Sequence, residues 1–192
     1  MLIYIHGFNS APQSFKARLI GERMRALGRA RDYRVPALPH RPSAAMALLR
    51  DLVERYPSAT LIGSSLGGFY ATWLAEHYAL RVALVNPVVR PYELLSGVLG
   101  PQKNLYTGAA YELTAQHIAE LKALEVATVT PKRYFLLTRT GDEVLDYRLG
   151  VEKYRGAQQH VIPGGDHGFG DFENHLDTVL AFCGVQSGTA LA

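Results

Sequence analysis

Short apolar runs alternate along this chain with stretches in which apolar residues recur every three or four positions. Six runs have the length and composition of buried strands. They lie at residues 2–5, 33–38, 59–62, 81–85, 134–138 and 160–162. Five stretches have helical spacing, and they lie at about residues 14–27, 43–56, 66–78, 146–155 and 171–182. The chain is therefore predicted to alternate strands with helices.

This alternation predicts an α/β fold, namely a three-layer α/β/α sandwich with about six parallel strands. Right-handed crossovers place every strand-to-helix loop at the carboxyl edge of such a sheet, where ligands bind. Residues 88–132 interrupt the alternation, so we expect them to form a small helical insertion. One domain is expected over residues 1–184, followed by a flexible tail at 185–192 that is rich in small residues.

Composition narrows the class of protein. With 192 residues, 48% of them apolar and 19% charged, the chain is unlike a disordered or fibrous protein. Its apolar runs fall far short of the roughly 18 residues that a membrane span needs, so no span is expected. A single cysteine, Cys183, excludes an intramolecular disulfide and a cysteine-rich zinc site. We expect a soluble, cytoplasmic protein.

The net charge of +3 is unevenly distributed. Residues 1–57 carry ten Lys and Arg against four Asp and Glu, and the excess is densest between Lys16 and Arg34. A basic stripe can attract phosphate-bearing partners. This stripe lacks the regularly interleaved aromatic residues of a nucleic-acid platform, which favours a solvated helix face, and no nucleic-acid partner is expected. A non-catalytic protein that binds an acidic partner through this face is an alternative.

The most informative segment is residues 61–69, where Gly-Ser-Ser-Leu-Gly at 63–67 follows an apolar strand and precedes a helix. The Gly-x-Ser-x-Gly pattern is typical of a nucleophile elbow, a sharp strand-to-helix turn that projects a serine above the sheet. Glycines two positions before and after the serine let the strand and helix backbones nearly touch. Ser65 is therefore the predicted nucleophile, with a plain tight turn as the alternative.

A serine hydroxyl needs a base that removes its proton. His167 lies in a glycine-rich loop directly after the last predicted strand, at the carboxyl edge of the sheet. His6 also follows a strand, but it stands at the base of its loop and is expected to form structural hydrogen bonds. His167 is therefore the predicted base among the seven histidines.

The base needs an acceptor that fixes its tautomer. Asp142 follows the strand at 134–138 in a Gly-Asp turn at the carboxyl edge, and Glu143 and Asp146 are possible substitutes. Asp166 is poorly placed to orient the ring of its own sequence neighbour. Asp142 is the predicted acceptor, because Ser, Asp and His then follow one another along the chain in an order known from α/β hydrolytic enzymes.

The oxyanion of an acyl transfer needs two N–H donors. Leu66, at the start of a helix, and Phe8, in the loop after the first strand, are the predicted donors. Asn9, Tyr92 and Phe169 are candidates for the substrate pocket. The insertion contains an amphipathic segment at about 112–125, so it either forms a partial lid whose apolar side lines the acyl pocket or packs on the sheet edge.

Five segments carry a resemblance to a known family, and together they span nearly the whole chain. They are residues 3–10, 63–70, 86–93, 141–147 and 164–169. In these segments the sequence resembles the α/β-hydrolase superfamily, and specifically the small YqiA-like bacterial esterases. The resemblance implies hydrolysis of carboxylic esters or thioesters through Ser65, Asp142 and His167. It also implies that neither a metal nor an organic cofactor takes part.

The sequence thus predicts a serine esterase with a Ser-His-Asp triad and an acyl-enzyme intermediate, acting on a small-molecule acyl ester or thioester. An acyl-CoA thioesterase or acyltransferase on the same site is an alternative, since the basic stripe would suit a phosphorylated carrier. A metal hydrolase is not expected, because the chain contains neither His-x-x-x-His nor Glu-x-x-His.

Overall fold

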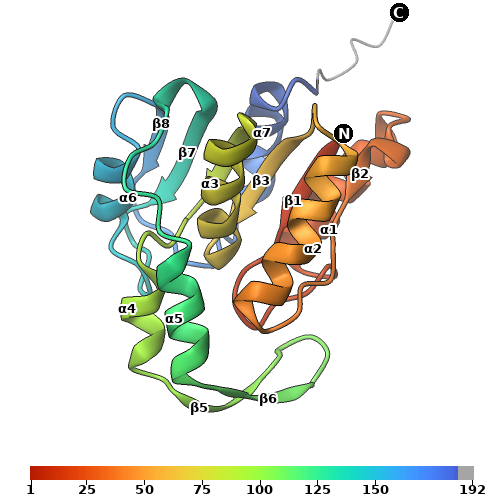
Figure 1. The fold of residues 1–192 in the computed structure, drawn as a ribbon. Coiled ribbons are helices and arrows are strands. Elements are labelled where there is room, and N and C mark those ends of the chain that lie inside the picture. Colours follow the sequence, from red (N-terminus) through yellow and green to blue (C-terminus); the bar gives the residue numbers. More distant parts are fainter. Residues whose placement is uncertain (186–192) are drawn as a thin grey trace, which may run out of the picture.

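Six parallel strands form the central sheet of the computed structural model, which describes residues 1–185 (Figure 1). The strands are β1 (Leu2–Ile5), β2 (Tyr33–Arg34), β3 (Thr60–Ser64), β4 (Arg81–Val85), β7 (Tyr134–Arg139) and β8 (Gln158–Ile162). They lie in the order β2-β1-β3-β4-β7-β8. The predicted α/β fold with six parallel strands is confirmed.

Helices cover both faces of this sheet (Figure 1). On one face lie α2 (Pro42–Arg55), α3 (Leu66–Tyr78) and α6 (Tyr147–Lys153), and on the other lie α1 (Phe15–Ala26) and α7 (Leu176–Phe182). Successive strand residues point to opposite faces, so Ile3, Ile5 and Leu61 pack towards α2 and α3, whereas Leu2, Tyr4 and Ile62 pack towards α1 and α7. Two apolar cores thus enclose the sheet.

Three short 3₁₀ helices complete this frame, at Ala30–Asp32, Pro131–Arg133 and Phe172–His175. The 3₁₀ helix at Phe172–His175 occupies residues that were predicted to belong to the last α-helix. Helix α7 therefore begins at Leu176, five residues later than predicted. Strand β2 is also shorter than the predicted run at 33–38, because Pro36 has no N–H to donate to a neighbouring strand.

The predicted insertion leaves the sheet after β4 and returns at β7. It contains α4 (Pro91–Ser96), the antiparallel hairpin of β5 (Gly100–Lys103) and β6 (Ala110–Leu113), and α5 (Ala115–Ala123). It lies beyond the carboxyl ends of the strands, at the bottom of Figure 1. The hairpin was not predicted, and it takes up residues that were assigned to a helix at 112–125. Both hairpin strands are short and largely exposed, so they lack the alternating apolar pattern that would reveal them.

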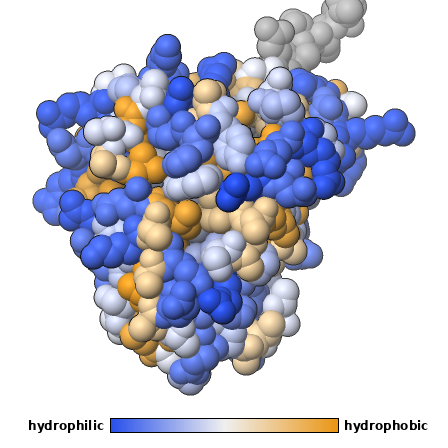
Figure 2. Space-filling model, viewed as in Figure 1, coloured by the Kyte–Doolittle hydropathy of each residue, from blue (hydrophilic) through white to orange (hydrophobic). Residues whose placement is uncertain are grey.

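Large exposed apolar side chains gather on and beside the insertion. Leu94, Val98, Leu99, Leu105 and Tyr106 are each 46% to 82% exposed. Figure 2 shows a band of hydrophobic residues over the same lower part of the molecule. Among the helices in residues 1–185, none is long and apolar enough to cross a membrane.

The predicted tail at 185–192 begins too early by one residue. Val185 is buried, and its N–H donates to the carbonyl oxygen of Leu180 at 2.9 Å, so it belongs to the end of α7. The remainder of the predicted tail, residues 186–192, lies outside the described residues.

Candidate active site

Ser65 stands in a strained turn between β3 and α3. Its backbone angles are φ 53° and ψ −121°, a region that residues other than glycine rarely adopt. The neighbouring glycines allow the turn: a Cβ atom on Gly67 would lie 1.9 Å from the carbonyl oxygen of Ile5, and one on Gly63 would lie 2.6 Å from that of Gly67. The backbone therefore has the geometry of a nucleophile elbow.

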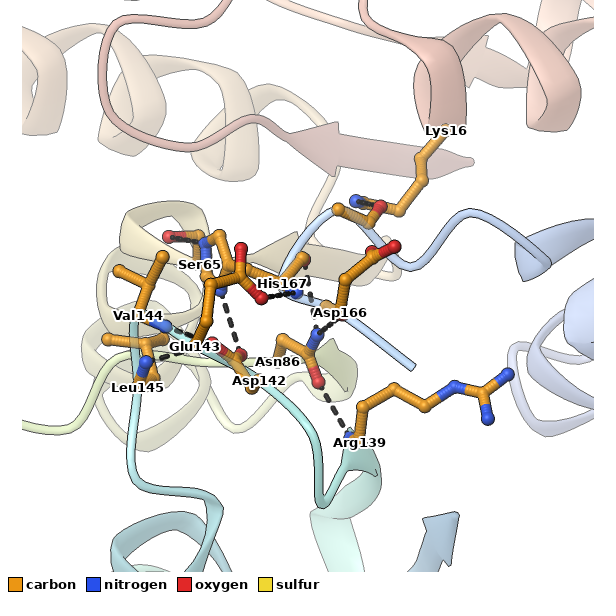
Figure 3. Close-up of polar contacts among 11 residues, drawn as sticks. Lys16, Ser65, Asn86, Arg139, Asp142, Glu143, Val144, Leu145, Asp166 and His167 are labelled. Carbon is orange, nitrogen blue, oxygen red and sulfur yellow. Dashed lines mark hydrogen bonds and ion pairs between the residues drawn. The ribbon is translucent and has the colours of Figure 1, made fainter. Parts of the chain in front are cut away.

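The structure brings Ser65, His167 and Asp142 into one line of hydrogen bonds (Figure 3). The Oγ of Ser65 lies 3.1 Å from Nε2 of His167, and Nδ1 of His167 lies 2.8 Å from Oδ2 of Asp142. The side chain of Asp142 is only 1% exposed, whereas that of His167 is 22% exposed. The imidazole thus lies between the serine hydroxyl and a shielded carboxylate.

Two backbone donors hold Asp142 in this position. Its Oδ1 accepts the N–H groups of Val144 at 2.9 Å and Leu145 at 2.8 Å. Burial alone would raise the pKa of Asp142, but the hydrogen bond from His167 and these N–H groups keep that pKa below its usual value. Asp142 therefore stays ionised opposite the ring.

The two substitutes for Asp142 have other partners. Glu143 accepts the backbone N–H of His167 at 3.0 Å and so contacts the loop. Asp146 caps α6 by accepting the N–H of Arg148 at 3.0 Å. Of the three carboxylates considered, only Asp142 contacts the imidazole ring.

Asn86 is a residue of this site to which the sequence analysis assigned no role. It follows β4, it is buried, and its φ is 41°. Its Nδ2 donates to the carbonyl oxygens of Asp166 and His167, each at 3.1 Å, and its Oδ1 accepts the N–H of Arg139 at 2.9 Å. One side-chain amide thus connects the end of β7 to the loop that carries the imidazole (Figure 3).

Lys16 of α1 supports the same loop from the other side. Its Nζ donates to the carbonyl oxygen of Gly168 at 2.6 Å. Burial lowers the pKa of Lys16 to about 8, although Asp166 and Asp142 act in the opposite direction. Only the tertiary structure reveals this contact of Lys16, since lysine is common on helix surfaces.

A cavity of about 200 Å³ opens over Ser65 and His167. Phe8 and Leu66, the predicted oxyanion donors, both line it. The N–H of Leu66 lies in the first turn of α3, where helix N–H groups have no partner within the helix. The rest of the lining is apolar and comes from Val88, Pro91, Leu94, Leu95 and Val144.

The three candidates for the substrate pocket have different locations. Asn9 lines a second cavity, of about 210 Å³, next to the first. Tyr92 lies on α4 beside Glu125, outside the lining of both cavities. Phe169 is also outside them: its ring is fully buried against Phe172 and under the guanidinium group of Arg139, which lies 4.8 Å from the ring centre. The aromatic character of Phe169 therefore contributes to the core.

Residues 1–184 match the model of a family described as "Uncharacterised protein family (UPF0227)". The chain belongs to this family. The match extends over nearly the whole of the described structure, so it includes both the elbow and the loops that carry Asp142 and His167 in this UPF0227 protein.

Solved structures similar to this UPF0227 protein include an α/β hydrolase and an esterase domain. Alpha/beta hydrolase domain-containing protein 10 from mouse is 18% identical, with a TM-score of 0.69 over 93% of this chain and 87% of that one. Est1E from Butyrivibrio proteoclasticus, solved with ferulic acid bound, is 16% identical, with a TM-score of 0.66 over 94% and 86%. The esterase domain of a Rhodothermus marinus protein is 17% identical, with a TM-score of 0.66 over 95% and 84%. At such identities the likeness concerns the fold, which is the α/β-hydrolase fold.

Two further features of this UPF0227 protein are its possible metal ligands and its basic stripe. Within residues 1–185, no three His, Cys, Asp or Glu side chains are arranged to hold a metal ion. In the basic stripe, Arg23 forms an ion pair with Asp177 of α7 at 2.9 Å, and Arg29 pairs with Asp32 at 3.1 Å. The positive charge of the stripe is thus partly balanced by nearby carboxylates.

Proposed function

We propose that this UPF0227 protein is a serine hydrolase that cleaves carboxylic esters through an acyl-enzyme. The observation that carries the proposal is the continuous path from Ser65 through His167 to Asp142, with the serine on a strained elbow. Structural serines do not need a base at 3.1 Å or a buried carboxylate behind that base. The α/β-hydrolase fold supports the same reading by analogy.

The proposed reaction begins when Nε2 of His167 takes the proton of Ser65 and Oγ forms a bond to the acyl carbon. The carbonyl π electrons move to the oxygen, and the N–H groups of Phe8 and Leu66 stabilise this oxyanion. As the oxyanion collapses, the bond to the leaving oxygen breaks and His167 returns the proton to that oxygen. Water then attacks the acyl-enzyme by the same steps and releases the carboxylic acid.

The lining of the cavity above Ser65 favours an uncharged substrate. Among the described residues that line it, His167 is the only one with an ionisable side chain. A charged group placed there would lose its hydration without gaining a partner. We therefore propose oxygen esters with uncharged groups as the substrate class, and acyl-CoA thioesters or acyl transfer as the second candidate, which the basic stripe on α1 would favour through electrostatic attraction to phosphates.

A fluorophosphonate probe tests the nucleophile. We expect covalent labelling of the wild type, loss of labelling in Ser65→Ala, and retained labelling in Ser64→Ala, which removes the adjacent hydroxyl. No labelling of the folded wild type, or equal labelling of Ser65→Ala, would overturn the proposal. Rates on matched oxygen esters and acyl-CoA thioesters at two salt concentrations then separate the substrate classes, because phosphate attraction weakens as salt is added.

A further inference from the structure

A second cavity, of about 210 Å³, lies on the other side of the loop that follows β1. Three segments line it: the loop at residues 6–12, the extended chain at 37–40, and the hairpin region at 104–111. Leu66 and Tyr70 of α3 complete the lining. The site proposed above does not account for this cavity.

The two cavities are close neighbours. Phe8 and Leu66, the proposed oxyanion donors, line both. Gly7 lines the second cavity, and a Cβ atom at that position would lie 3.5 Å from Oγ of Ser65. The second cavity therefore adjoins the nucleophile through Gly7, Phe8 and Leu66, whereas His167 lines the first cavity alone.

Among the described residues, the second cavity is lined without acidic side chains, lysine or arginine. Burial lowers the pKa of His6, whose Nδ1 lies 3.1 Å from the oxygen of Gly7 and whose Nε2 accepts the N–H of Leu38 at 3.3 Å, so both ring nitrogens are used. The neutral ring adds no charge to the cavity near pH 7.

Several other polar side chains of the lining have partners. The amide of Asn9 accepts the hydroxyl of Tyr111 at 2.7 Å and donates to Gln102 at 3.1 Å. His40 stacks on Tyr111 with ring centres 4.4 Å apart, and its Nδ1 lies 3.0 Å from Nε2 of His117. The lining also includes Phe8, two leucines, two prolines and four alanines, a composition that suits an apolar group.

We propose that the second cavity is the acyl subsite, and that it takes a compact, uncharged apolar acyl group of about phenyl size. The proposal rests on the proposed function. The leaving oxygen must receive its proton from Nε2 of His167, so the leaving group lies in the first cavity. The oxyanion points to the N–H groups of Phe8 and Leu66, and the acyl group then extends past them. An apolar cavity of about 150 Å³ holds benzene, so this one has room for such a group.

The hairpin is hydrogen-bonded to the loop at residues 6–12, which lines both cavities through Phe8. Leu105 donates its N–H to the oxygen of Asn9 at 2.9 Å, and Asn104 donates its side-chain amide to the oxygen of Ser10 at 2.8 Å. The part of the insertion at 104–111 therefore closes the proposed acyl subsite, while Leu94 and Leu95 of α4 contribute to the first cavity. Two parts of the insertion, α4 and the hairpin, thus serve different halves of the substrate.

Filling the cavity tests the assignment. Tyr111→Trp enlarges the ring that reaches Asn9 and His40 from the hairpin, and Ala37→Phe adds a ring from the opposite wall. We expect each to lower kcat/KM for p-nitrophenyl phenylacetate by at least about tenfold relative to p-nitrophenyl acetate. The ratio between the methyl and benzyl esters of acetic acid should stay within about twofold. Glu112→Trp, exposed on the same strand, is the matched control and should follow the wild type.

The assignment would be overturned if the ratio between methyl and benzyl acetate changed while the ratio between p-nitrophenyl phenylacetate and p-nitrophenyl acetate did not. A measurement without turnover separates this proposal from the function itself. In Ser65→Ala protein, phenylacetamide should shift the amide resonances of Ala37 and Ala110 in NMR spectra, and Tyr111→Trp should abolish these shifts. Labelling at Ser65 without such shifts would overturn the acyl subsite but would still support the proposed hydrolase activity. Shifts without labelling would overturn the hydrolase and the acyl assignment together.

Discussion

The side-chain amide of Asn86 donates to the backbone oxygen of His167 at 3.1 Å. Asn86 follows β4, whereas His167 follows β8, and β7 lies between these strands in the sheet. Since the same amide accepts the N–H of Arg139 at the end of β7, one buried side chain joins the loops that carry Asp142 and His167. The alignment of the imidazole thus depends on a residue that does not contact it.

Asn86→Asp should impair turnover more than binding. The aspartate tolerates a positive φ but replaces the amide donor by an oxygen facing two carbonyl groups. We expect kcat on a short ester to fall about 100-fold, as for a misplaced catalytic group, with KM nearly unchanged and the circular dichroism spectrum retained. Asn174→Asp, on an exposed 3₁₀ turn, is the control. An unchanged kcat would show that the loops hold their geometry without the amide.

Asp142→Asn should be nearly inactive although its shape is conserved. An amide that still accepts the N–H groups of Val144 and Leu145 turns its NH₂ towards His167, which stabilises the tautomer that cannot accept the serine proton. We expect kcat to fall by about four orders of magnitude, as for comparable triads. Steady-state rates on an activated ester measure this. Asp146→Asn retains its capping role at α6 and should keep wild-type rates; equal losses in both variants would contradict the assignment of Asp142.

Gly67→Ala should destabilise the fold strongly. Its Cβ atom would lie 1.9 Å from the carbonyl oxygen of Ile5 and 2.7 Å from that of His6, both of them backbone atoms that cannot rotate away. We expect a loss of about 3 kcal/mol or more in the free energy of unfolding, measured with urea. Gly97→Ala is the matched control, because its φ is −78° and its Cβ would lie 3.5 Å from the nearest atom. That variant should differ from the wild type by less than about 1 kcal/mol.

Glu120 makes the attachment of α5 dependent on pH. Burial raises the pKa of Glu120, but hydrogen bonds from Arg41 and Ser43 outweigh it and lower the pKa to about 2. Because the folded pKa lies below the unfolded value, this stabilisation is complete above about pH 4.5 and is lost as the pH falls towards 2.

Thermal melts of wild type and Glu120→Gln check this dependence. The variant should melt several degrees lower at pH 7, and the difference should shrink steadily below pH 4.5. The nearby His40–His117 pair is present in both proteins, and the charge of Glu120 acts to raise the pKa of His117 against burial. Glu112→Gln, exposed on β6, should match the wild type throughout. A difference that stays constant down to pH 3 would contradict the role given to the Glu120 carboxylate.

Local pattern was sufficient to predict most of the frame. The period of apolar residues predicted all six strands of the sheet, and α3 has the predicted bounds at Leu66–Tyr78. The elbow was recognisable because its two glycines and its serine lie within five residues. The hairpin at 100–113 escaped prediction because its strands are polar and exposed, and because their pairing joins residues about ten apart.

The amino-acid sequence by itself determined the alternation of strands and helices, the turn at Ser65 and the loops that carry Asp142 and His167, since each depends on neighbours along the chain. Only the tertiary structure decided which carboxylate faces the imidazole, that Asn86 joins two loops, that Phe169 lies in the core, and that a second cavity adjoins Ser65. Each of these depends on side chains from strands and loops far apart in sequence. Strand order and side-chain packing bring them within contact distance, and neither periodicity nor residue type encodes that order.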